Sequence, residues 1–564
     1  MPTIDVDYTE FKKMLGIELD KDLDKINDVL AFAKGEVKLF DENTGMMSVE
    51  IKDTNRADLW NIEGLVRTLR GFLGLDKGLR RYATSGKLVD IYVDSRLQSI
   101  RPYIGCSIIR NVRLTDPIIR ALMQLQDKLD HTYGRNRRRT SIGLYDFDLT
   151  KPPLSYTVAK PTEVSFVPLG FDKEMSLKQI LKEHPKGVEY GSIVSAHPVY
   201  PILFDNEKKV LSFPPVINSN DLGRITEETK NVLVEVTGTV NETVLNTLKI
   251  VTLSLVDRGG KAYSATVHYP HNNQTVVTPN FETRQLDLDL AYTNRILDLN
   301  LTAKQVADLL VKAGYEVEKL VRDKISVRIP CYRIDIMHPI DLVEDIAIAY
   351  GYNNIKPFWR KLPTKGGARP EQGFLNITRD LMIGLGFQEV LTYNMTNPEN
   401  LFTRMNLKKQ TIIEVANPKV QTLTCLRNWL LPSLMEFFSC NLSIEYPQKI
   451  FELGTATVLD AKAETRTRDV DILAAAVSHA NASFTEIKSD VDAVFTNLGL
   501  QWQIKETKHP SFIDGRAGRL LINGAEVGIL GEIHPKVLRM WTLENPVAAF
   551  ELNMGSINTM RIKR

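Results

Sequence analysis

Hydrophobic and polar positions repeat with two different periods along the chain, which indicates a mixture of helices and strands. After residues 53–59, apolar positions follow a helical spacing through Leu65 and Leu69. Residues 87–93 alternate with period two, which predicts a strand, and residues 117–129 return to a helical pattern. The chain is therefore expected to be an α+β protein.

Breaks in these patterns divide the chain into four predicted domains, which suits 564 residues at roughly 150 residues per domain. They are a small N-terminal α/β domain, a large mixed domain, a small helix–strand domain and a C-terminal domain, over residues 1–85, 86–270, 280–356 and 365–564. Thr302 and Gln305 are spaced as a capping box for a helix ending at Gly314. The Pro- and Gly-rich residues 362–370 are typical of a linker, and a helix is expected to begin near Glu371.

The composition is that of a folded protein, with 43% hydrophobic and 25% charged residues. Because 71 Lys and Arg nearly cancel 69 Asp and Glu, any nucleic-acid-binding surface must be a local patch. Cys106, Cys331, Cys425 and Cys440 are too widely spaced for a zinc or redox motif, so we expect reduced thiols. The sequence contains no signal peptide or membrane span, which predicts a cytoplasmic protein.

Four carboxylates cluster in sequence around one predicted helix. Asp341, Glu344 and Asp345 lie at positions i, i+3 and i+4, hence on one helix face, and Asp335 can join them from the preceding loop. Oxygen ligands without histidine or thiolate partners suit Mg²⁺. From spacing alone, however, helix capping by Asp341 and a favourable helix dipole for the other two explain the pattern more simply.

The segment from Arg333 to Ile355 contains Arg-Ile-Asp-Ile and then Asp-Leu-Val-Glu-Asp-Ile-Ala-Ile-Ala-Tyr-Gly-Tyr-Asn-Asn-Ile. It resembles the B5 domain of phenylalanyl-tRNA synthetase β subunits. Residues 53–67 and 512–535 resemble the same family, so the likeness spans nearly the whole chain. The chain lacks room for the extra RNA-binding domains of bacterial β subunits, which indicates the archaeal and eukaryotic type. The resemblance implies that Mg²⁺ binds at Asp335, Asp341, Glu344 and Asp345.

The resemblance also implies a role for each predicted domain. Residues 86–270 are expected to be the B3/B4 tRNA-editing domain, and residues 365–564 an antiparallel domain with the class II synthetase fold. That domain should be inactive in aminoacylation, because Phe451-Glu452 lacks the arginine expected in motif 2 and no motif 3 pattern follows. ATP-dependent joining of phenylalanine to tRNA(Phe) is therefore expected on an α subunit, within an (αβ)₂ heterotetramer.

An editing site is expected because a pocket built for phenylalanine cannot strongly reject tyrosine, which adds only a hydroxyl. By the resemblance, mischarged Tyr-tRNA(Phe) would be hydrolysed in the B3/B4 domain. Glu235 and Thr237 share one face of the predicted strand 231–239 and, with Ser212 and Asn218, are the candidate pocket residues. Without the resemblance, the same alternation favours an ordinary core strand with Glu235 and Thr237 exposed to water.

Two other functions remain open from the sequence. A non-enzymatic RNA-binding or interaction scaffold accounts for parts of the pattern, and so does a freestanding hydrolase of mischarged tRNA. The four arginines within Arg135–Arg139 suit either tRNA phosphates or an ordinary solvated surface. A DNA-binding helix-turn-helix after Thr302 is disfavoured, because no basic recognition helix follows it.

Overall fold

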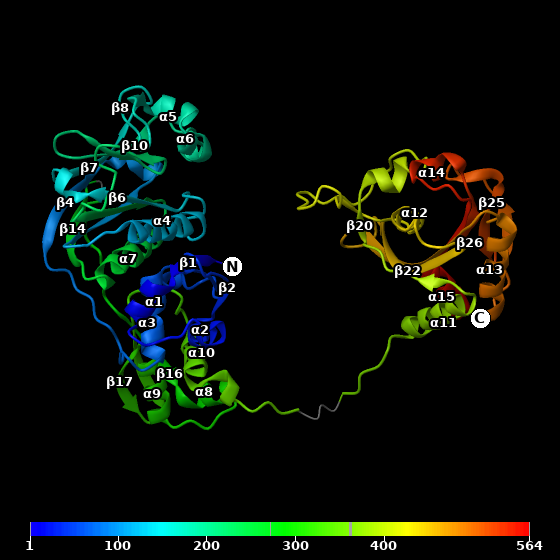
Figure 1. The fold of residues 1–564 in the computed structure, drawn as a ribbon, viewed down its shortest axis with the longest axis horizontal. Helices are drawn as coiled ribbons and strands as arrows, with labels where there is room; N and C mark the ends of the chain where they lie inside the picture. Colours follow the sequence, from blue (N-terminus) through cyan, green and yellow to red (C-terminus); the bar gives the residue numbers. More distant parts are fainter. Residues whose placement is uncertain (1, 271, 360–363, 563–564) are drawn as a thin grey trace. The chain divides into compact units, whose positions relative to one another are not determined.

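The computed structural model describes residues 2–270, 272–359 and 364–562, so residues 362 and 363 of the predicted linker lie outside the described residues. The chain divides into two compact units, Met1–Phe358 and Trp359–Arg564. Each unit has its own sheets and its own hydrophobic core (Figure 1). Over the described ranges, we find no helix with the length and apolar character needed to cross a membrane.

The first unit begins with a three-stranded antiparallel sheet and three helices. The strand order is β1 (Thr3–Asp7), β3 (Met46–Ile51), β2 (Gly35–Asp41). The helices are α1 (Tyr8–Leu15), α2 (Leu23–Leu30) and α3 (Ile62–Phe72). The Asn61 side chain begins α3 by accepting a hydrogen bond from the backbone N–H of Gly64. Helix α3 is the one predicted after residues 53–59.

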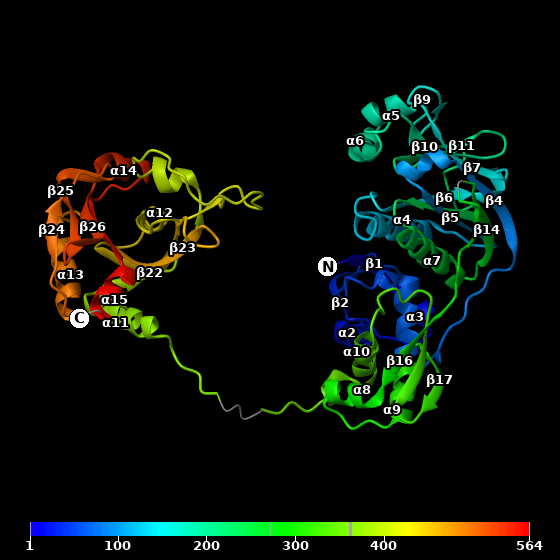
Figure 2. The ribbon, with the colours of Figure 1, turned by 180° about the vertical axis from the view of Figure 1, so that it is seen from behind.

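A ten-stranded mixed sheet forms most of the first unit. Its order is β12-β11-β10-β7-β4-β14-β5-β13-β6, with β15 paired to β14. The bounds are β4 (Lys87–Val93), β5 (Tyr103–Arg110), β6 (Thr140–Asp146), β7 (Leu154–Ala159), β10 (Tyr200–Phe204), β11 (Val210–Phe213), β12 (Ile217–Asn218), β13 (Val232–Gly238), β14 (Lys261–Tyr269) and β15 (Gln274–Thr278). Helices α4 (Asp116–His131) and α7 (Asn241–Asp257) pack together against one face of this sheet (Figures 1 and 2).

A small insertion between β7 and β10 lies beside the part of the large sheet that contains β10 (Figure 1). It contains a two-stranded sheet and two short helices. These elements are β8 (Ser165–Phe166), β9 (Met175–Ser176), α5 (Leu177–Glu183) and α6 (Pro185–Tyr190). Leu177 and Ile180 of α5 pack with Phe213 of β11 in one apolar cluster, which ties the insertion to the sheet.

Strand β13, which carries Glu235 and Thr237, is enclosed on all sides. It pairs with β5 on one side and β6 on the other, and all seven of its residues are buried. Val232, Val234 and Val236 pack in the core shared with α4 and α7, as the alternation predicted. The accompanying expectation that Glu235 and Thr237 face water is wrong, because this sheet is also covered on its other face.

The first unit ends in a second three-stranded sheet with its own helices. The order is β16 (Arg284–Asp289), β18 (Lys324–Ile329), β17 (Glu316–Val321), accompanied by α8 (Leu290–Leu297), α9 (Ala303–Lys312) and α10 (Pro339–Tyr350). Thr302 and Gln305 form the predicted capping box at the start of α9. After α9, Gly314 adopts a left-handed backbone with φ of 88°, which suits glycine at a helix end.

The second unit contains a seven-stranded sheet that is antiparallel except at its β19–β22 edge. The order is β19 (Gln388–Glu389), β22 (Gln448–Leu459), β23 (Thr467–Ser478), β27 (Val547–Asn553), β26 (Ala525–Ile533), β25 (Phe512–Ile522), β24 (Gln503–Glu506). A two-stranded sheet joins β20 (Met395–Thr396) and β21 (Cys425–Leu426). The helices are α11 (Pro370–Gly384), α12 (Leu431–Cys440), α13 (Phe484–Asn497), α14 (Pro535–Met540) and α15 (Met554–Ile562).

Cysteine chemistry agrees with the sequence. All four cysteines are free thiols, as expected. Cys106, Cys331 and Cys425 are buried, whereas Cys440 is exposed at the end of α12 and has no packing role comparable to the others. The prediction of reduced thiols is confirmed for all four cysteines.

The capping box of α9 gives the first testable prediction. Replacing Thr302 by alanine removes the side-chain acceptor for the Gln305 N–H, so we expect α9 to lose about 1 kcal/mol of local stability. Amide hydrogen exchange over residues 306–310 measures this loss. Lys304→Ala, at an exposed position of the same first turn, should leave the exchange rates unchanged.

Candidate functional site

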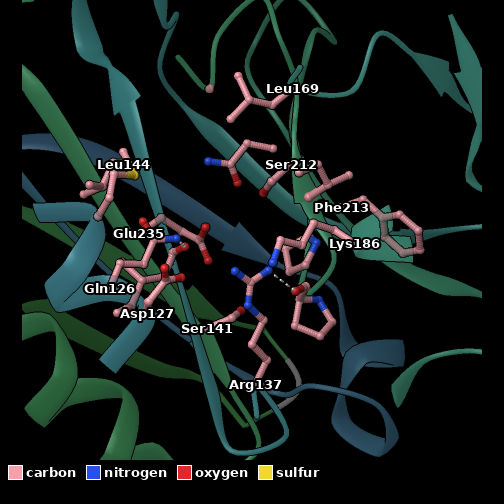
Figure 3. Close-up of a pocket in the computed structure, with 17 residues that line it drawn as sticks. Gln126, Asp127, Arg137, Ser141, Leu144, Leu169, Lys186, Ser212, Phe213 and Glu235 are labelled. Atoms are coloured by element: carbon pink, nitrogen blue, oxygen red, sulfur yellow. Dashed lines mark hydrogen bonds between the residues drawn. The ribbon is translucent and has the colours of Figure 1, made fainter. Parts of the chain in front are cut away.

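A cavity of about 220 Å³ lies between β6, β13, α4 and the β11–β12 hairpin (Figure 3). Three of the four predicted pocket residues, Ser212, Asn218 and Glu235, line it. Arg137 and Ser141 line it as well. The fold thus brings together side chains from residues 137–235, which no sequence spacing would place in one cavity.

Glu235 is the buried acid of this cavity, with 2% of its surface exposed. The Tyr145 hydroxyl donates a hydrogen bond of 2.8 Å to Glu235 Oε2, while Oε1 has no partner in hydrogen-bond geometry. Burial raises the pKa of Glu235 to about 7, because removing the carboxylate from water disfavours its charged form. The Thr237 hydroxyl is near enough to help lower the pKa of this acid. Ser212 Oγ is also buried without a hydrogen bond. Arg137 Nε is likewise buried without a hydrogen bond, so three polar atoms of the described cavity-lining residues are left without a hydrogen bond from the protein.

A glycine makes room for the Tyr145–Glu235 contact. Gly143 lies directly opposite Glu235 on the neighbouring strand β6. A Cβ at this position would lie 2.2 Å from the Tyr145 hydroxyl oxygen and 2.6 Å from Glu235 Oε2. Any larger residue would displace the hydrogen-bonded pair, so the Tyr145–Glu235 contact requires glycine at this position. Gly143 and Tyr145 were not predicted as site residues. Their positions two residues apart on β6 place them on one face of that strand, beside Glu235 of the neighbouring strand β13.

Thr237 is placed differently from the other three predicted residues. It does not line the cavity; its hydroxyl accepts a hydrogen bond of 3.0 Å from Arg101 Nε. Arg101 also donates to the Thr237 carbonyl at 2.7 Å and to Ser141 Oγ at 3.0 Å. Only 1% of the Arg101 surface is exposed. These hydrogen bonds therefore replace the hydration that the guanidinium loses on burial. Thr237 therefore supports the cavity wall through Arg101.

The basic cluster Arg135–Arg139 does not act as one surface. Arg135 and Arg138 are exposed, whereas Arg137 is buried and its guanidinium lies in the cavity wall (Figure 3). Arg137 Nε forms an ion pair of 2.8 Å with Asp130 at the end of α4. The expectation that the cluster lies on the protein surface is therefore correct for part of it only.

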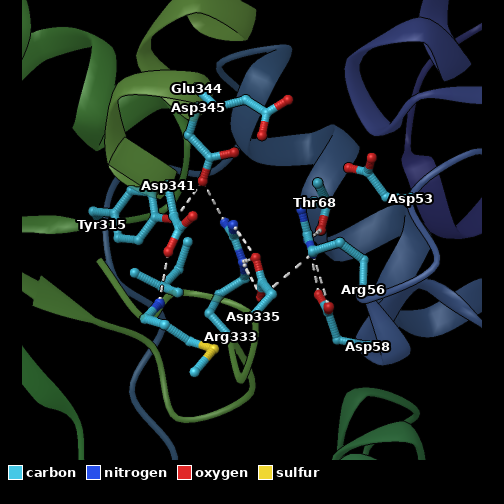
Figure 4. A network of polar contacts seen from close by, with 12 residues as sticks. Asp53, Arg56, Asp58, Thr68, Tyr315, Arg333, Asp335, Asp341, Glu344 and Asp345 are labelled. Carbon is cyan, nitrogen blue, oxygen red and sulfur yellow. Dashed lines mark hydrogen bonds and ion pairs between the residues drawn. The ribbon is translucent and has the colours of Figure 1, made fainter. Parts of the chain in front are cut away.

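The four carboxylates predicted to bind Mg²⁺ are near one another but have other partners (Figure 4). Asp335 and Asp345 both pair with Arg333, at 2.7 Å and 2.6 Å. Asp345 also accepts a hydrogen bond from the Tyr315 hydroxyl. Arg333 and both carboxylates are almost fully buried, so this is a pairing of charges away from water.

The other two carboxylates lie at the start of α10. Asp341 accepts hydrogen bonds from the N–H groups of Met337 and His338, at 2.7 Å and 2.8 Å, and thus caps the helix from its third position. Exposed Glu344 pairs with Lys34, which also lies 3.2 Å from Asp53. The capping explanation considered from the sequence therefore describes Asp341, with His338 as the N-cap residue itself.

The same network reaches the N-terminal part of the chain. Arg56 pairs with Asp58 at 2.9 Å and lies 3.8 Å from Asp335 (Figure 4). Acids and guanidinium groups alternate along the path Asp58, Arg56, Asp335, Arg333, Asp345. The neighbouring arginines hold the pKa of Asp335 down, at about 2, despite its burial. The network therefore joins the segment before α3 to the segment before α10.

This arrangement does not provide a ready-made cation site. Throughout the part of the chain that the structure describes, no three His, Cys, Asp or Glu side chains are placed together to hold a metal ion. Two of the four predicted ligands face a guanidinium, one faces backbone N–H groups and one faces an ammonium. The residues as arranged do not fit Mg²⁺, and the metal site stays a prediction.

Comparison with known proteins identifies the family. A model of the tRNA synthetase B5 domain matches residues 286–352, and a model of the phenylalanyl tRNA synthetase beta chain CLM domain matches residues 355–554. The phenylalanine–tRNA ligase beta subunit of Pyrococcus furiosus is 43% identical over 98% of this chain and 99% of its own length. That of Archaeoglobus fulgidus is 37% identical over 99% of this chain and 98% of its own.

This chain belongs to the phenylalanine–tRNA ligase beta subunit family. A crystal structure of an N-terminal fragment of the phenylalanyl-tRNA synthetase beta subunit from Pyrococcus horikoshii agrees with this, with 39% identity and a TM-score of 0.60. It covers 62% of this chain and all of the fragment. The family resemblance predicted from the sequence is confirmed. The relatives named here are archaeal, which agrees with the archaeal and eukaryotic type that was predicted.

The buried acid of this beta-family chain predicts a dependence of stability on pH. The pKa of Glu235 rises from 4.5 to about 7 on folding, so the folded state binds the extra proton between these values and loses relative stability as pH rises through them. Glu235→Gln should therefore stabilise the chain at pH 8 by about 3 kcal/mol, and by less at pH 5.5. Unfolding midpoints at both pH values measure the difference, with exposed Glu228→Gln as the matched control.

The acidic network predicts a different mutational response. Arg333→Gln leaves the Asp335 and Asp345 carboxylates buried without their cation, which should cost about 3–5 kcal/mol of stability in denaturant unfolding. Adding Asp335→Asn and Asp345→Asn should recover much of that loss. Arg295→Gln, at an exposed position of α8, should have no effect. Equal effects of the two arginine changes would contradict the importance of the network.

Proposed function

We propose that this chain is the β subunit of a phenylalanine–tRNA ligase and that the Glu235 cavity hydrolyses Tyr-tRNA(Phe). Joining of L-phenylalanine to tRNA(Phe) with ATP then requires an α subunit, in an (αβ)₂ heterotetramer. Identity with beta subunits over almost the full length of both chains supports the first part. The buried, half-satisfied carboxylate of Glu235 supports the second.

Selectivity for tyrosine follows from the unpartnered Glu235 Oε1. A tyrosine hydroxyl donates one hydrogen bond to a carboxylate, whereas phenylalanine would leave this buried acceptor unpaired. Tyr145 already holds Oε2, so the acid has a fixed direction before the substrate arrives. The cavity thus distinguishes tyrosine from phenylalanine by the hydroxyl group, which the aminoacylation pocket cannot reject strongly.

The proposed reaction is hydrolysis of the aminoacyl ester by water. The water oxygen attacks the carbonyl carbon and the bond from this carbon to the ribose oxygen breaks. One proton passes to the ribose oxygen, and tyrosine leaves as a carboxylate with release of the other. Ser212 and Asn218 line the same cavity and are our candidates for orienting water or ester. Among the described cavity residues there is no Cys or His nucleophile pair, which favours direct attack by water.

We assign aminoacylation to the α subunit because this chain has no free arginine for ATP at its expected motif 2 position. At the expected motif 2 position, Glu452 is buried and pairs with Arg427 at 2.7 Å, and Thr392 donates to its other oxygen at 2.6 Å. A guanidinium already neutralised by a buried acid is not available for ATP phosphates. The class II fold of this unit is part of the proposal.

Further elements of the proposal rest on the resemblance. The domain boundaries 1–85, 86–270, 280–356 and 365–564 are proposed for the N-terminal, B3/B4, B5 and class II-like domains. Cytoplasmic location is proposed as well. Mg²⁺ at Asp335, Asp341, Glu344 and Asp345 is proposed from the resemblance alone. Binding would require these carboxylates to leave the partners described above, so no role is derived for the ion. Metal analysis of the assembled enzyme tests it: equal Mg²⁺ content in wild type and Asp341→Ala/Glu344→Ala would contradict this ligand set.

Deacylation of Tyr-tRNA and Phe-tRNA by the assembled α and β chains tests the editing site. We expect rapid hydrolysis of Tyr-tRNA, slow hydrolysis of Phe-tRNA, and loss of at least about 100-fold in this preference for Glu235→Ala. Thr237→Ala should lower the rate by loosening Arg101, with a smaller effect on the preference. Aminoacylation with phenylalanine is the internal measure of correct assembly.

The matched control is Glu228→Ala, an exposed acid in the loop before β13. It should hydrolyse both substrates at wild-type rates. If the assembled wild type charges phenylalanine but leaves Tyr-tRNA intact, the editing proposal is wrong and the chain is a structural β subunit. If no charging appears with any class II α chain, the scaffold alternative is favoured.

A further inference from the structure

The loop after α4 has an unusual backbone where it enters the cavity. Arg135, Asn136 and Arg137 are three successive non-glycine residues with positive φ, at 51°, 53° and 63°. Each such residue costs roughly 1–2 kcal/mol relative to a right-handed conformation. Strained backbone of this kind persists where surrounding contacts enforce it, and it is concentrated at functional sites. The strain here turns the chain so that Arg137 points inward while Arg135 and Arg138 stay exposed.

Contacts from both sides enforce this conformation. The N–H of Arg137 donates to the Asp130 carbonyl at 3.0 Å, and the Arg137 carbonyl accepts a bond of 3.0 Å from Arg101 Nη1. Gly134 allows the close approach, since a Cβ there would lie 2.7 Å from the carbonyl oxygens of Asp130 and Thr140. The backbone of Arg137 is therefore fixed by the same Arg101 that holds Thr237.

The side chain of Arg137 is equally constrained, with only 9% of the residue exposed. Its guanidinium lies 4.3 Å from the ring centre of Tyr190, which is within range for a cation–π contact. Nη1 donates to the carbonyl oxygens of Pro215 and Val216 at 3.2 Å and 3.1 Å, and Nε pairs with Asp130. Nη2 makes no hydrogen bond within the described structure.

We propose that Nη2 of Arg137 binds the carbonyl oxygen of the aminoacyl ester in the Glu235 cavity and stabilises the negative charge that develops there when water attacks. This inference rests on the editing function proposed above. Glu235 holds the phenol end of tyrosine, so the opposite end of the substrate requires a different partner on the cavity wall. A preoriented N–H donor supplies that partner without reorganising during the reaction.

The first test is the kinetics of Tyr-tRNA hydrolysis by the assembled enzyme carrying Arg137→Gln. We expect kcat to fall by about 100-fold or more with KM nearly unchanged, because the contact strengthens in the transition state. Arg120→Gln is the matched control: Arg120 lies on α4 outside the cavity, with 78% of its side chain exposed. It should leave kcat and KM unchanged. A rise in KM alone for Arg137→Gln would overturn the proposal.

A second variant separates binding from folding. Arg137→Gln leaves Asp130 buried without its cation, whereas Asp130→Asn/Arg137→Gln removes both charges. We expect the double variant to aminoacylate phenylalanine normally and still to lack Tyr-tRNA hydrolysis. Recovery of hydrolysis in the double variant would show that Arg137 acts only by neutralising Asp130, which contradicts the proposal.

Binding of small probes to the full-length chain tests the contact without chemistry. L-Tyrosine carries a carboxylate and tyramine does not. The full negative charge of the carboxylate resembles the oxyanion of the transition state and not the neutral ester, so the wild-type chain should bind tyrosine at least about 10-fold more tightly. Arg137→Gln should abolish this difference, whereas Glu235→Gln should weaken both ligands alike. An unchanged ratio in Arg137→Gln would refute the assignment. If wild-type hydrolysis of Tyr-tRNA is itself absent, the editing function fails; if it is present and Arg137 variants are unaffected, only this inference fails.

Discussion

The burial of the acid Glu235 on β13, the strand next to the β6 edge of the large sheet, is the constraint on which the cavity depends. Strand β13 is covered on both faces. The Glu235 carboxylate therefore loses its hydration, and its side chain is restricted in the rotamers that it can adopt. The fold supplies one donor from Tyr145 and makes space for it by Gly143 on the paired strand. One oxygen is left without a donor, and the selectivity proposed for the cavity rests on this unpaired acceptor.

Buried charge also organises the region between the N-terminal segment and α10. Arg333 lies between Asp335 and Asp345, and Arg56 extends the chain of alternating charges to Asp58. Such pairs contribute little net stability compared with apolar packing, but removing one partner is costly. The network therefore specifies how these segments of the first unit dock, because another arrangement would leave several charges buried alone.

Periodicity and cap residues were sufficient to predict much of the fold. The strand at residues 87–93 and the capping box of Thr302 and Gln305 occur as predicted. Helix α11 begins at Pro370, one residue before the predicted Glu371. These features depend on neighbours a few residues apart, so local sequence determines them.

The site was only partly predictable, because its contacts join distant segments. Glu235 was found from strand alternation and the family resemblance, but its burial depends on a second covering layer that alternation cannot reveal. Tyr145 and Arg137 lie about 90 and 98 residues earlier and carry no motif. For the carboxylates near α10, the helical spacing was predicted correctly but their partners were not. The spacing could not reveal that Arg333 and Lys34 would pair with them.

The central claim is that Glu235 recognises the hydroxyl of tyrosine inside the cavity. A crystal structure of the chain with a non-hydrolysable tyrosyl-adenosine, in which an amide replaces the ester, tests it most directly. We expect the phenol oxygen to lie within about 3.2 Å of Glu235 Oε1, with the amide toward Arg137. A ligand bound with its phenol ring outside the cavity, or with its hydroxyl away from Glu235, would contradict the account.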